Sequence, residues 1–226
     1  KGIRLDSGDL AYLSKRARRM LDEAGYPDAI ICASGDLDEY LITSLKNQGA
    51  KIDLWGVGTK LITSADMPAL GGVYKLSALY PKEGGEVPKI KLSDNSDKIT
   101  NPAFKDVYRI YDNATGKAEA DLIVVRGEKI DTGKPLTVFH PKDTWKRTTF
   151  TDYSVRQLTV PVIKGGKLVY ELPPLSAVCE YAEREKETFW DEYKRLDNPH
   201  VYKVDLSQKL YDIKNKLISE IRAENA

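Results

Sequence analysis

Along the first 80 residues, stretches in which hydrophobic positions recur with a helical period alternate with short continuous hydrophobic runs. Between Leu10 and Ala24, apolar residues recur with a period near 3.6, which predicts an amphipathic helix. A second helix is predicted to carry an apolar stripe with Leu41 and Leu45 and to end at Gly49. Short apolar runs that predict strands alternate with these helices, at residues 3–5, 29–33, 52–55 and 72–76. This alternation predicts an α/β unit with parallel strands.

Polar loops rich in glycine follow the first three predicted strands, at residues 6–9, 34–36 and 56–59. In parallel sheets and barrels, ligands bind at the carboxyl ends of the strands. All three loops lie at such ends, so the sequence predicts one binding face built from adjacent loops.

The pattern changes after residue 80. Short apolar runs predict strands at residues 107–111, 122–125, 136–139 and 158–163. The turn sequences at residues 113–116 and 164–167 predict hairpins, and Pro161 favours an edge position for its strand.

Two charged helices are predicted near the end of the chain, at residues 181–196 and 207–223, the second capped by Ser207. The predicted organisation is therefore an α/β segment at residues 1–80, a β-rich subdomain at 81–175 and a helical segment at 176–226.

The composition of the chain argues against some classes of binding partner and indicates a cellular compartment. The chain has 226 residues, and 35 basic residues against 34 acidic ones give a net charge of +1, which offers no electrostatic basis for binding nucleic acid or an anionic membrane. There is neither a membrane-length apolar run nor a signal-peptide pattern, and the two cysteines fit a reducing compartment, so a cytoplasmic location is expected. His140 and His200 each adjoin a proline, a setting typical of loop or capping residues.

Candidate chemistry begins at the end of the first predicted strand. Arg4 and Asp6 are two positions apart, so their side chains share one side of the sheet. A charged pair inside a barrel is unfavourable unless it binds a ligand, and the alternative is an ion pair that only fixes the loop. One interpretation makes Asp36 and Asp38 only helix-start residues, favoured by the helix dipole, and Asp36 forms a near capping box with Glu39 three residues later. The other interpretation of Asp36 is contact with a ligand.

The loop Gly56-Val57-Gly58-Thr59 offers backbone N–H groups and a hydroxyl. Such loops bind phosphate because their donors converge and no side chain blocks the approach. The alternative is a tight turn that needs glycine for its backbone alone.

Three motifs, in this order and spacing, resemble nicotinate phosphoribosyltransferases. They are RLDSGDL at residues 4–10, SGDLDE at 34–39 and DLWGVGTKLITSADMPALGGVYKL at 53–76. The resemblance continues through KLSDNSDKITNPAFKDVYRIYD at 91–112 to DNPHVYKVDLSQKL at 197–210. It therefore covers nearly the whole chain.

The resemblance implies an enzyme of NAD biosynthesis that transfers a phosphoribosyl group from 5-phosphoribosyl 1-diphosphate to nicotinate, forming nicotinate mononucleotide. It also implies ATP hydrolysis coupled through a phosphorylated histidine, Mg²⁺ that accompanies the diphosphate, and a cytoplasmic homodimer. The implied fold is an irregular TIM-like barrel followed by a β-rich domain.

The same resemblance assigns roles to individual residues. Arg4 and Asp6 would be the catalytic residues and would also bind substrate. Arg4 would face the nicotinate carboxylate, and Asp6 would hold ribose hydroxyls or order the metal, with Asp9 as a further possible Mg²⁺ ligand. The other substrate-binding residues would be Ser34, Gly35, Asp36, Gly56, Gly58 and Thr59, the last two cradling the 5-phosphate.

Neither histidine lies in a context that matches the family's phosphorylated histidine, which the resemblance places upstream of RLDSGD. We therefore expect the chain to be the C-terminal half of such an enzyme and to be inactive alone. Two alternatives stay open at this point: a nicotinamide phosphoribosyltransferase, and a non-catalytic phosphate-binding or assembly fragment.

Overall fold

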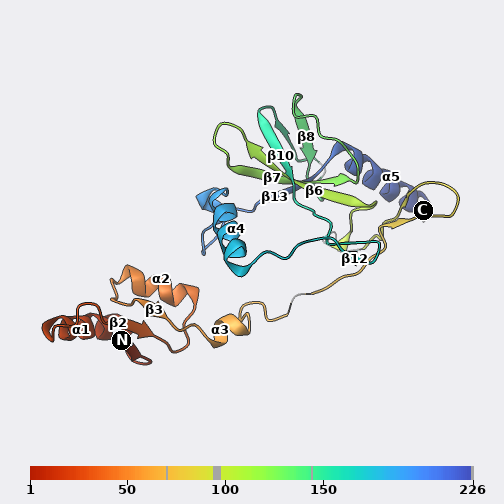
Figure 1. Ribbon diagram of the computed structural model, residues 1–226. Coiled ribbons are helices and arrows are strands. Elements are labelled where there is room, and N and C mark those ends of the chain that lie inside the picture. The colour runs from red at the N-terminus through yellow and green to blue at the C-terminus, as the bar shows by residue number, and fades with distance from the viewer. Residues whose placement is uncertain (70, 94–97, 144, 225–226) are drawn as a thin grey trace. The chain divides into compact units, whose positions relative to one another are not determined.

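The computed structural model describes residues 1–226 except 70, 94–97, 144 and 225–226. The chain forms two compact units, Lys1–Val73 and Tyr74–Ala226, which are described separately (Figure 1). Residues 94–97 of the motif at 91–112, and residue 70 of the motif at 53–76, lie outside the described residues.

The first unit is an α/β unit with a parallel sheet, as predicted. Its strands pair in the order β1-β2-β3 and its helices follow them in turn. The elements are β1 (Gly2–Leu5), α1 (Leu10–Glu23), β2 (Ile30–Ala33), α2 (Glu39–Asn47), β3 (Leu54–Trp55) and α3 (Thr59–Ile62). The strand predicted at residues 72–76 is not formed, because no neighbouring strand of the described chain pairs with it. The described strands form no closed barrel.

The helices of this unit cover one face of the three-stranded sheet. Leu5, Ala33 and Trp55 lie in register on the covered face, against a core of Leu10, Ala11, Leu37 and Leu45. Arg4, Cys32 and Leu54 lie in register one position away and therefore on the opposite face. There Leu54 is 53% exposed. Parallel sheets are normally buried on both faces, so this face is unusually open.

Asp38, not Asp36, caps α2, which corrects one of the two interpretations of Asp36. The Asp38 side chain accepts a hydrogen bond from the Leu41 N–H at 2.8 Å, and its backbone is extended, as the capping position requires. Asp36 has a left-handed backbone with φ of 47°. This conformation turns the chain before the helix begins.

Replacing Asp38 by alanine is expected to lower the free energy of unfolding by about 1 kcal/mol, because one helix N–H loses its partner. The matched control is Asp36→Asn, which keeps a residue that tolerates the left-handed conformation and should change stability by less than about 0.5 kcal/mol. Urea denaturation of both variants measures the difference. Equal losses would contradict the assignment of the cap.

The second unit is built on a mixed six-stranded sheet of order β10-β6-β7-β13-β8-β9. Its strands are β6 (Lys105–Asp112), β7 (Ala118–Val125), β8 (Leu136–Phe139), β9 (Arg147–Phe150), β10 (Tyr153–Gln157) and β13 (Lys203–Leu206). Smaller pairs are β4 (Ala78–Leu79) with β5 (Val87–Pro88), and β11 (Ile163–Lys164) with β12 (Lys167–Leu168). The helices are α4 (Leu175–Glu187), α5 (Gln208–Glu224) and the short 3₁₀ helix η2 (Asp191–Tyr193).

The hairpins predicted at residues 113–116 and 164–167 are confirmed, and so is the Ser207 cap, whose hydroxyl accepts from the Leu210 N–H at 3.2 Å.

The strand predicted at 158–163 is wrong: β10 ends at Gln157, and Pro161, which has no N–H to donate, lies in the loop that follows. Residues 176–226 are not purely helical either, because β13 lies within the sheet, paired with both β7 and β8.

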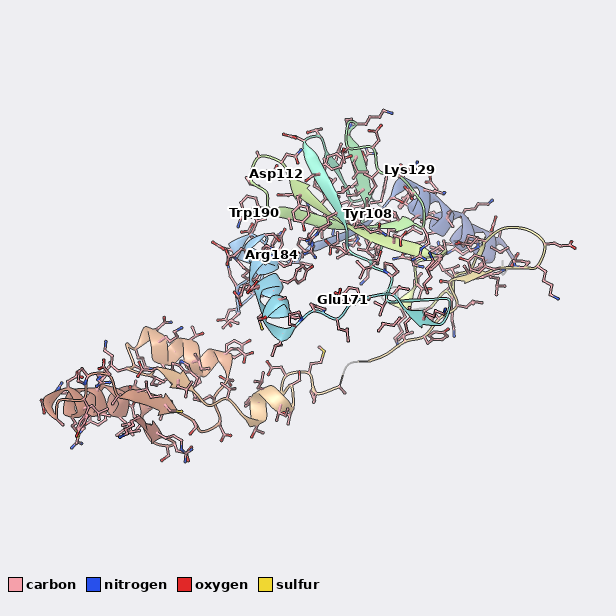
Figure 2. The ribbon with its side chains drawn as sticks, in the orientation of Figure 1. Tyr108, Asp112, Lys129, Glu171, Arg184 and Trp190 are labelled. Atoms are coloured by element: carbon pink, nitrogen blue, oxygen red, sulfur yellow. The ribbon has the colours of Figure 1, made fainter. Side chains whose placement is uncertain are left out.

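A largely buried ionic network joins α4 to the sheet. Arg109 on β6 donates to both carboxylate oxygens of Asp121 on β7, at 2.8 and 3.1 Å. Its guanidinium also lies 3.5 Å from Glu185 on α4 and over the ring of Phe189, 4.6 Å from the centroid. Nearby, Trp190, labelled in Figure 2, donates from its indole nitrogen to Glu119 at 3.1 Å. These contacts hold the end of α4 in place on the sheet.

Candidate functional site

All the residues singled out for the site lie in the first unit, at or just beyond the carboxyl ends of its strands. Arg4 is on β1 and Asp6 follows it; residues 34–36 follow β2, and residues 56–59 follow β3 or begin α3. The parallel order of the strands places the three loops at one edge of the sheet, as the sequence predicts.

The structure brings Arg4, Asp6 and Ser34 into a closed triangle of hydrogen bonds. Arg4 Nη1 donates to Asp6 Oδ1 at 2.9 Å and to Ser34 Oγ at 2.8 Å. Ser34 Oγ in turn donates to Asp6 Oδ1 at 2.6 Å. The Ser34 hydrogen bond, and then the charge of Arg4, hold the pKa of the Asp6 carboxyl below its usual value, so Asp6 is ionised at neutral pH.

The triangle is exposed rather than buried, since the Arg4 and Asp6 side chains keep 62% and 58% of their surface. An exposed ion pair contributes little to stability. In this unit the polar atoms of the triangle are therefore open to a ligand.

Gly35 sits where no other residue fits. Its φ is 97°, and a Cβ at this position would lie 2.4 Å from the Asp6 carbonyl oxygen. The loop after β2 thereby approaches the loop after β1 closely, and the Ser34 N–H donates to the Leu5 carbonyl at 2.9 Å. The close approach is what allows Ser34 to reach Asp6.

The loop after β3 adjoins this site through Gly56, whose N–H donates to the Ala33 carbonyl at 2.7 Å. A Cβ on Gly56 would lie 3.3 Å from the Ser34 Cβ, whereas one on Gly58 would have no atom within 4 Å. Thr59 begins α3. The Gly58 backbone is thus open on the side where a side chain would otherwise stand.

Two hollows border these loops. One of about 340 Å³ is lined by Asp6, Ser7, Gly8, Asp9, Leu10, Gly35, Leu41, Leu45 and Gln48. The other, of about 210 Å³, lies between the start of α2 and the α3 segment, with Asp38, Val57, Lys60 and Asp66 in its wall. Lys60, directly after Thr59 in the sequence, lines this second hollow and is not among the residues that the sequence singled out.

The acidic residues here do not form a metal cage. Asp9 Oδ1 caps α1 by accepting from the Tyr12 N–H at 2.9 Å. Within the described ranges, no group of three or more His, Cys, Asp or Glu side chains could hold a metal ion. The same ranges contain no helix with the length and apolar character needed to cross a bilayer.

The chain is similar to known proteins over nearly its whole length. Residues 104–214 match the family described as "Nicotinate phosphoribosyltransferase C-terminal domain". The chain is 46% identical over 222 residues to nicotinate phosphoribosyltransferase of Bacillus subtilis, covering 98% of this chain and 45% of that protein. It is 36% identical over 231 residues to the enzyme of that name from Dictyostelium discoideum, covering 96% and 38%. The chain thus spans less than half the length of the curated relatives it matches.

The crystal structure of human nicotinic acid phosphoribosyltransferase has the same fold, with a TM-score of 0.73 at 24% identity, over 96% of this chain and 40% of that one. The fold and sequence matches together show that the chain is similar to phosphoribosyltransferases. More narrowly, residues 104–214 match the C-terminal domain of nicotinate phosphoribosyltransferases, and the relatives named above carry that name.

Proposed function

We propose that this chain provides the phosphoribosyl-binding part of a nicotinate phosphoribosyltransferase, which forms nicotinate mononucleotide from nicotinate and 5-phosphoribosyl 1-diphosphate. The observation that carries the proposal is the exposed triangle of Arg4, Asp6 and Ser34 at the ends of β1 and β2. The names of the relatives favour nicotinate over nicotinamide as the base.

Each part of the site suits one part of the substrates. Arg4 uses only Nη1 in the triangle, so the rest of its planar guanidinium is free to pair with a planar carboxylate such as that of nicotinate. Ionised Asp6 accepts hydrogen bonds from ribose hydroxyls, and Gly35 and Asp36 line the sugar. Backbone N–H groups of Gly58 and Thr59 hold the 5-phosphate. Catalysis here rests on positioning and on stabilising the leaving diphosphate.

We further propose that β1–β3 are part of an irregular, TIM-like barrel. The support is the uncovered sheet face with Arg4, Cys32 and Leu54, since parallel strands are normally buried on both sides. That face becomes the barrel interior once further strands close the sheet. This would place Arg4 inside, facing the substrate.

Mg²⁺ and ATP belong to the same proposal. Mg²⁺ commonly binds through one or two carboxylates together with substrate phosphates, and Asp6 fits that role, whereas Asp9 has one oxygen engaged in the α1 cap. When bound, Mg²⁺ neutralises charge on the diphosphate. ATP coupling, the homodimer and the cytoplasmic location rest on the family relationship.

Binding of 5-phosphoribosyl 1-diphosphate tests the proposal. Calorimetric titration of the 226-residue chain with this compound and Mg²⁺ should show saturable binding, and Asp6→Asn should weaken it at least about tenfold, because a ribose acceptor loses its charge. Asp28→Asn, at an exposed position in the same unit, is the matched control. Equal affinities of the two variants, or no binding at all, would overturn the proposal.

A further inference from the structure

A cavity of about 650 Å³ lies in the second unit, and none of the residues discussed above for phosphoribosyl binding lines it. Its walls include His140, Trp145, Lys146 and Arg147 from the β8–β9 hairpin and its connection, and Lys203 and Asp205 from β13. β13 pairs with β7 over all four residues, but with β8 only at Leu206 opposite Phe139. The hairpin therefore diverges from the first part of β13, and the cavity fills the gap.

One carboxylate oxygen of Asp205, in the cavity wall, has no hydrogen-bond donor among the described residues. The residue is only 4% exposed, and its Oδ1 accepts no hydrogen bond within the described part of the chain. Burial raises the pKa of the Asp205 carboxyl, against the opposing charges of His140 and Lys203. A buried carboxylate oxygen without a donor is rare in folded proteins, and here it lines a space large enough for a ligand.

Positive charge surrounds this single carboxylate. Lys146, Arg147 and Lys203 line the same cavity, and their side chains are exposed. Lys146 pairs with Asp143 at 2.5 Å, whereas in the ranges that the structure describes neither Arg147 nor Lys203 forms an ion pair. With Lys146 paired to Asp143, Arg147 and Lys203 still outnumber the one carboxylate in the cavity wall, which favours a ligand that carries an anionic group.

His140 adds a donor to this wall. Its Nδ1 accepts backbone N–H groups of Lys142 and Asp143 at 3.3 and 2.8 Å. In the neutral imidazole the proton therefore lies on Nε2, which is left to donate.

Trp145 offers an aromatic surface at the same cavity. It is 77% exposed, and the Lys146 ammonium lies 4.9 Å from its ring centroid. An exposed indole beside cations is an arrangement on which nucleic acid bases stack.

We propose that this cavity binds a nucleoside phosphate. The base stacks on Trp145 and donates an N–H to Asp205 Oδ1, and the phosphate pairs with Arg147 and Lys203. An extended peptide added to the open edge of β13 is a less suitable occupant, because only residues 203–205 lack a partner strand on that side.

The experiment separates the base from the phosphate. With saturating 5-phosphoribosyl 1-diphosphate and Mg²⁺ present to occupy the proposed phosphoribosyl site, the 226-residue chain is titrated calorimetrically with adenosine 5′-monophosphate, adenosine and ribose 5-phosphate. Arg147→Gln should weaken adenosine 5′-monophosphate and ribose 5-phosphate at least about tenfold and leave adenosine unchanged. Asp205→Leu should weaken the monophosphate and adenosine by a similar factor and leave ribose 5-phosphate unchanged.

Two further variants keep the test decisive. Trp145→Ala is at the surface, so it should fold normally while losing base binding like Asp205→Leu, even if that variant proves unstable. Arg195→Gln, an exposed arginine of the same unit that does not line the cavity, should bind like the native chain.

Each result of these titrations either supports the nucleoside phosphate proposal or overturns it. Absence of saturable monophosphate binding, or binding that none of the three cavity variants changes, would overturn the proposal, as would ribose 5-phosphate binding as tightly as the monophosphate. Because these variants lie in the second unit, they should leave 5-phosphoribosyl 1-diphosphate binding intact, which separates this proposal from that of the phosphoribosyl site.

Discussion

Replacing Gly35 by alanine is expected to lower the free energy of unfolding of the first unit by about 3 kcal/mol or more and to weaken binding of 5-phosphoribosyl 1-diphosphate at least about tenfold. The new Cβ would lie 2.4 Å from the Asp6 carbonyl oxygen, and the backbone φ of 97° is already unfavourable for an L-residue. To relieve the clash, the loops after β1 and β2 must separate. Separation breaks the hydrogen bond from Ser34 to Asp6, and with it the triangle.

Gly25→Ala is the matched control for this experiment. Gly25 also has a positive φ, 82°, but a Cβ there would have no atom within 4 Å. Its expected loss is therefore the conformational strain alone, about 1 to 2 kcal/mol, with ligand binding unchanged. Urea denaturation and calorimetric titration of both variants give the comparison. If both variants lose the same stability and affinity, the close approach of the two loops does not matter.

Replacing Arg109 by methionine is expected to lower the free energy of unfolding of the second unit by about 3 kcal/mol at pH 7. The Arg109 and Asp121 side chains are only 14% and 15% exposed. Removing the arginine leaves the Asp121 carboxylate without its two strongest donors in a largely buried setting. Glu185 keeps its bidentate partner Arg156, so the end of α4 should loosen but stay attached.

The comparison is with Lys134→Met, which removes the same charge from a pair whose lysine is 78% exposed, and should change stability by less than about 0.5 kcal/mol. Hydrogen exchange at peptides from β6 and β7 reports on this unit apart from the other. Faster exchange in Arg109→Met alone is expected. Unchanged exchange would show that the network adds no net stability.

The stability that the ionic network around Glu185 contributes depends on pH. Hydrogen bonding from Arg156, and then the charges of Arg156 and Arg109, hold the pKa of the Glu185 carboxyl below its ordinary value of 4.5. A lowered pKa in the folded state stabilises the fold at a pH above the unfolded value, and this contribution is lost as the pH falls through the lower, folded value. The network therefore contributes fully at pH 7.

Much of the first unit could be predicted because its signals are local. The 3.6-residue period sets α1, and the short apolar runs set β1 and β2. The spacing of Arg4 and Asp6 was enough to place them together. The part played by Ser34 was not accessible in this way, because it depends on the parallel register of β1 and β2 across 28 residues. The α2 cap was misplaced because backbone conformation, not residue type, separates Asp36 from Asp38.

The second unit was harder for the same reason. β9 and β13, with sequences RTTF and KVDL, are short and rich in polar residues, so neither has a clear strand pattern. Both become strands because distant neighbours supply hydrogen bonds, in the case of β13 from β7, some 80 residues earlier. Turn sequences, in contrast, predicted the hairpins correctly, because glycine acts within a few residues.

The position of β13 also sets the order in which the second unit can assemble during synthesis. The strands on either side of it, β7 and β8, are translated long before residues 203–206 leave the ribosome. Until then the growing chain carries two unfinished sheets with open edges, a state prone to mispairing with other chains. Folding of this unit is therefore completed late, and premature release before β13 would leave a product unable to close its own sheet.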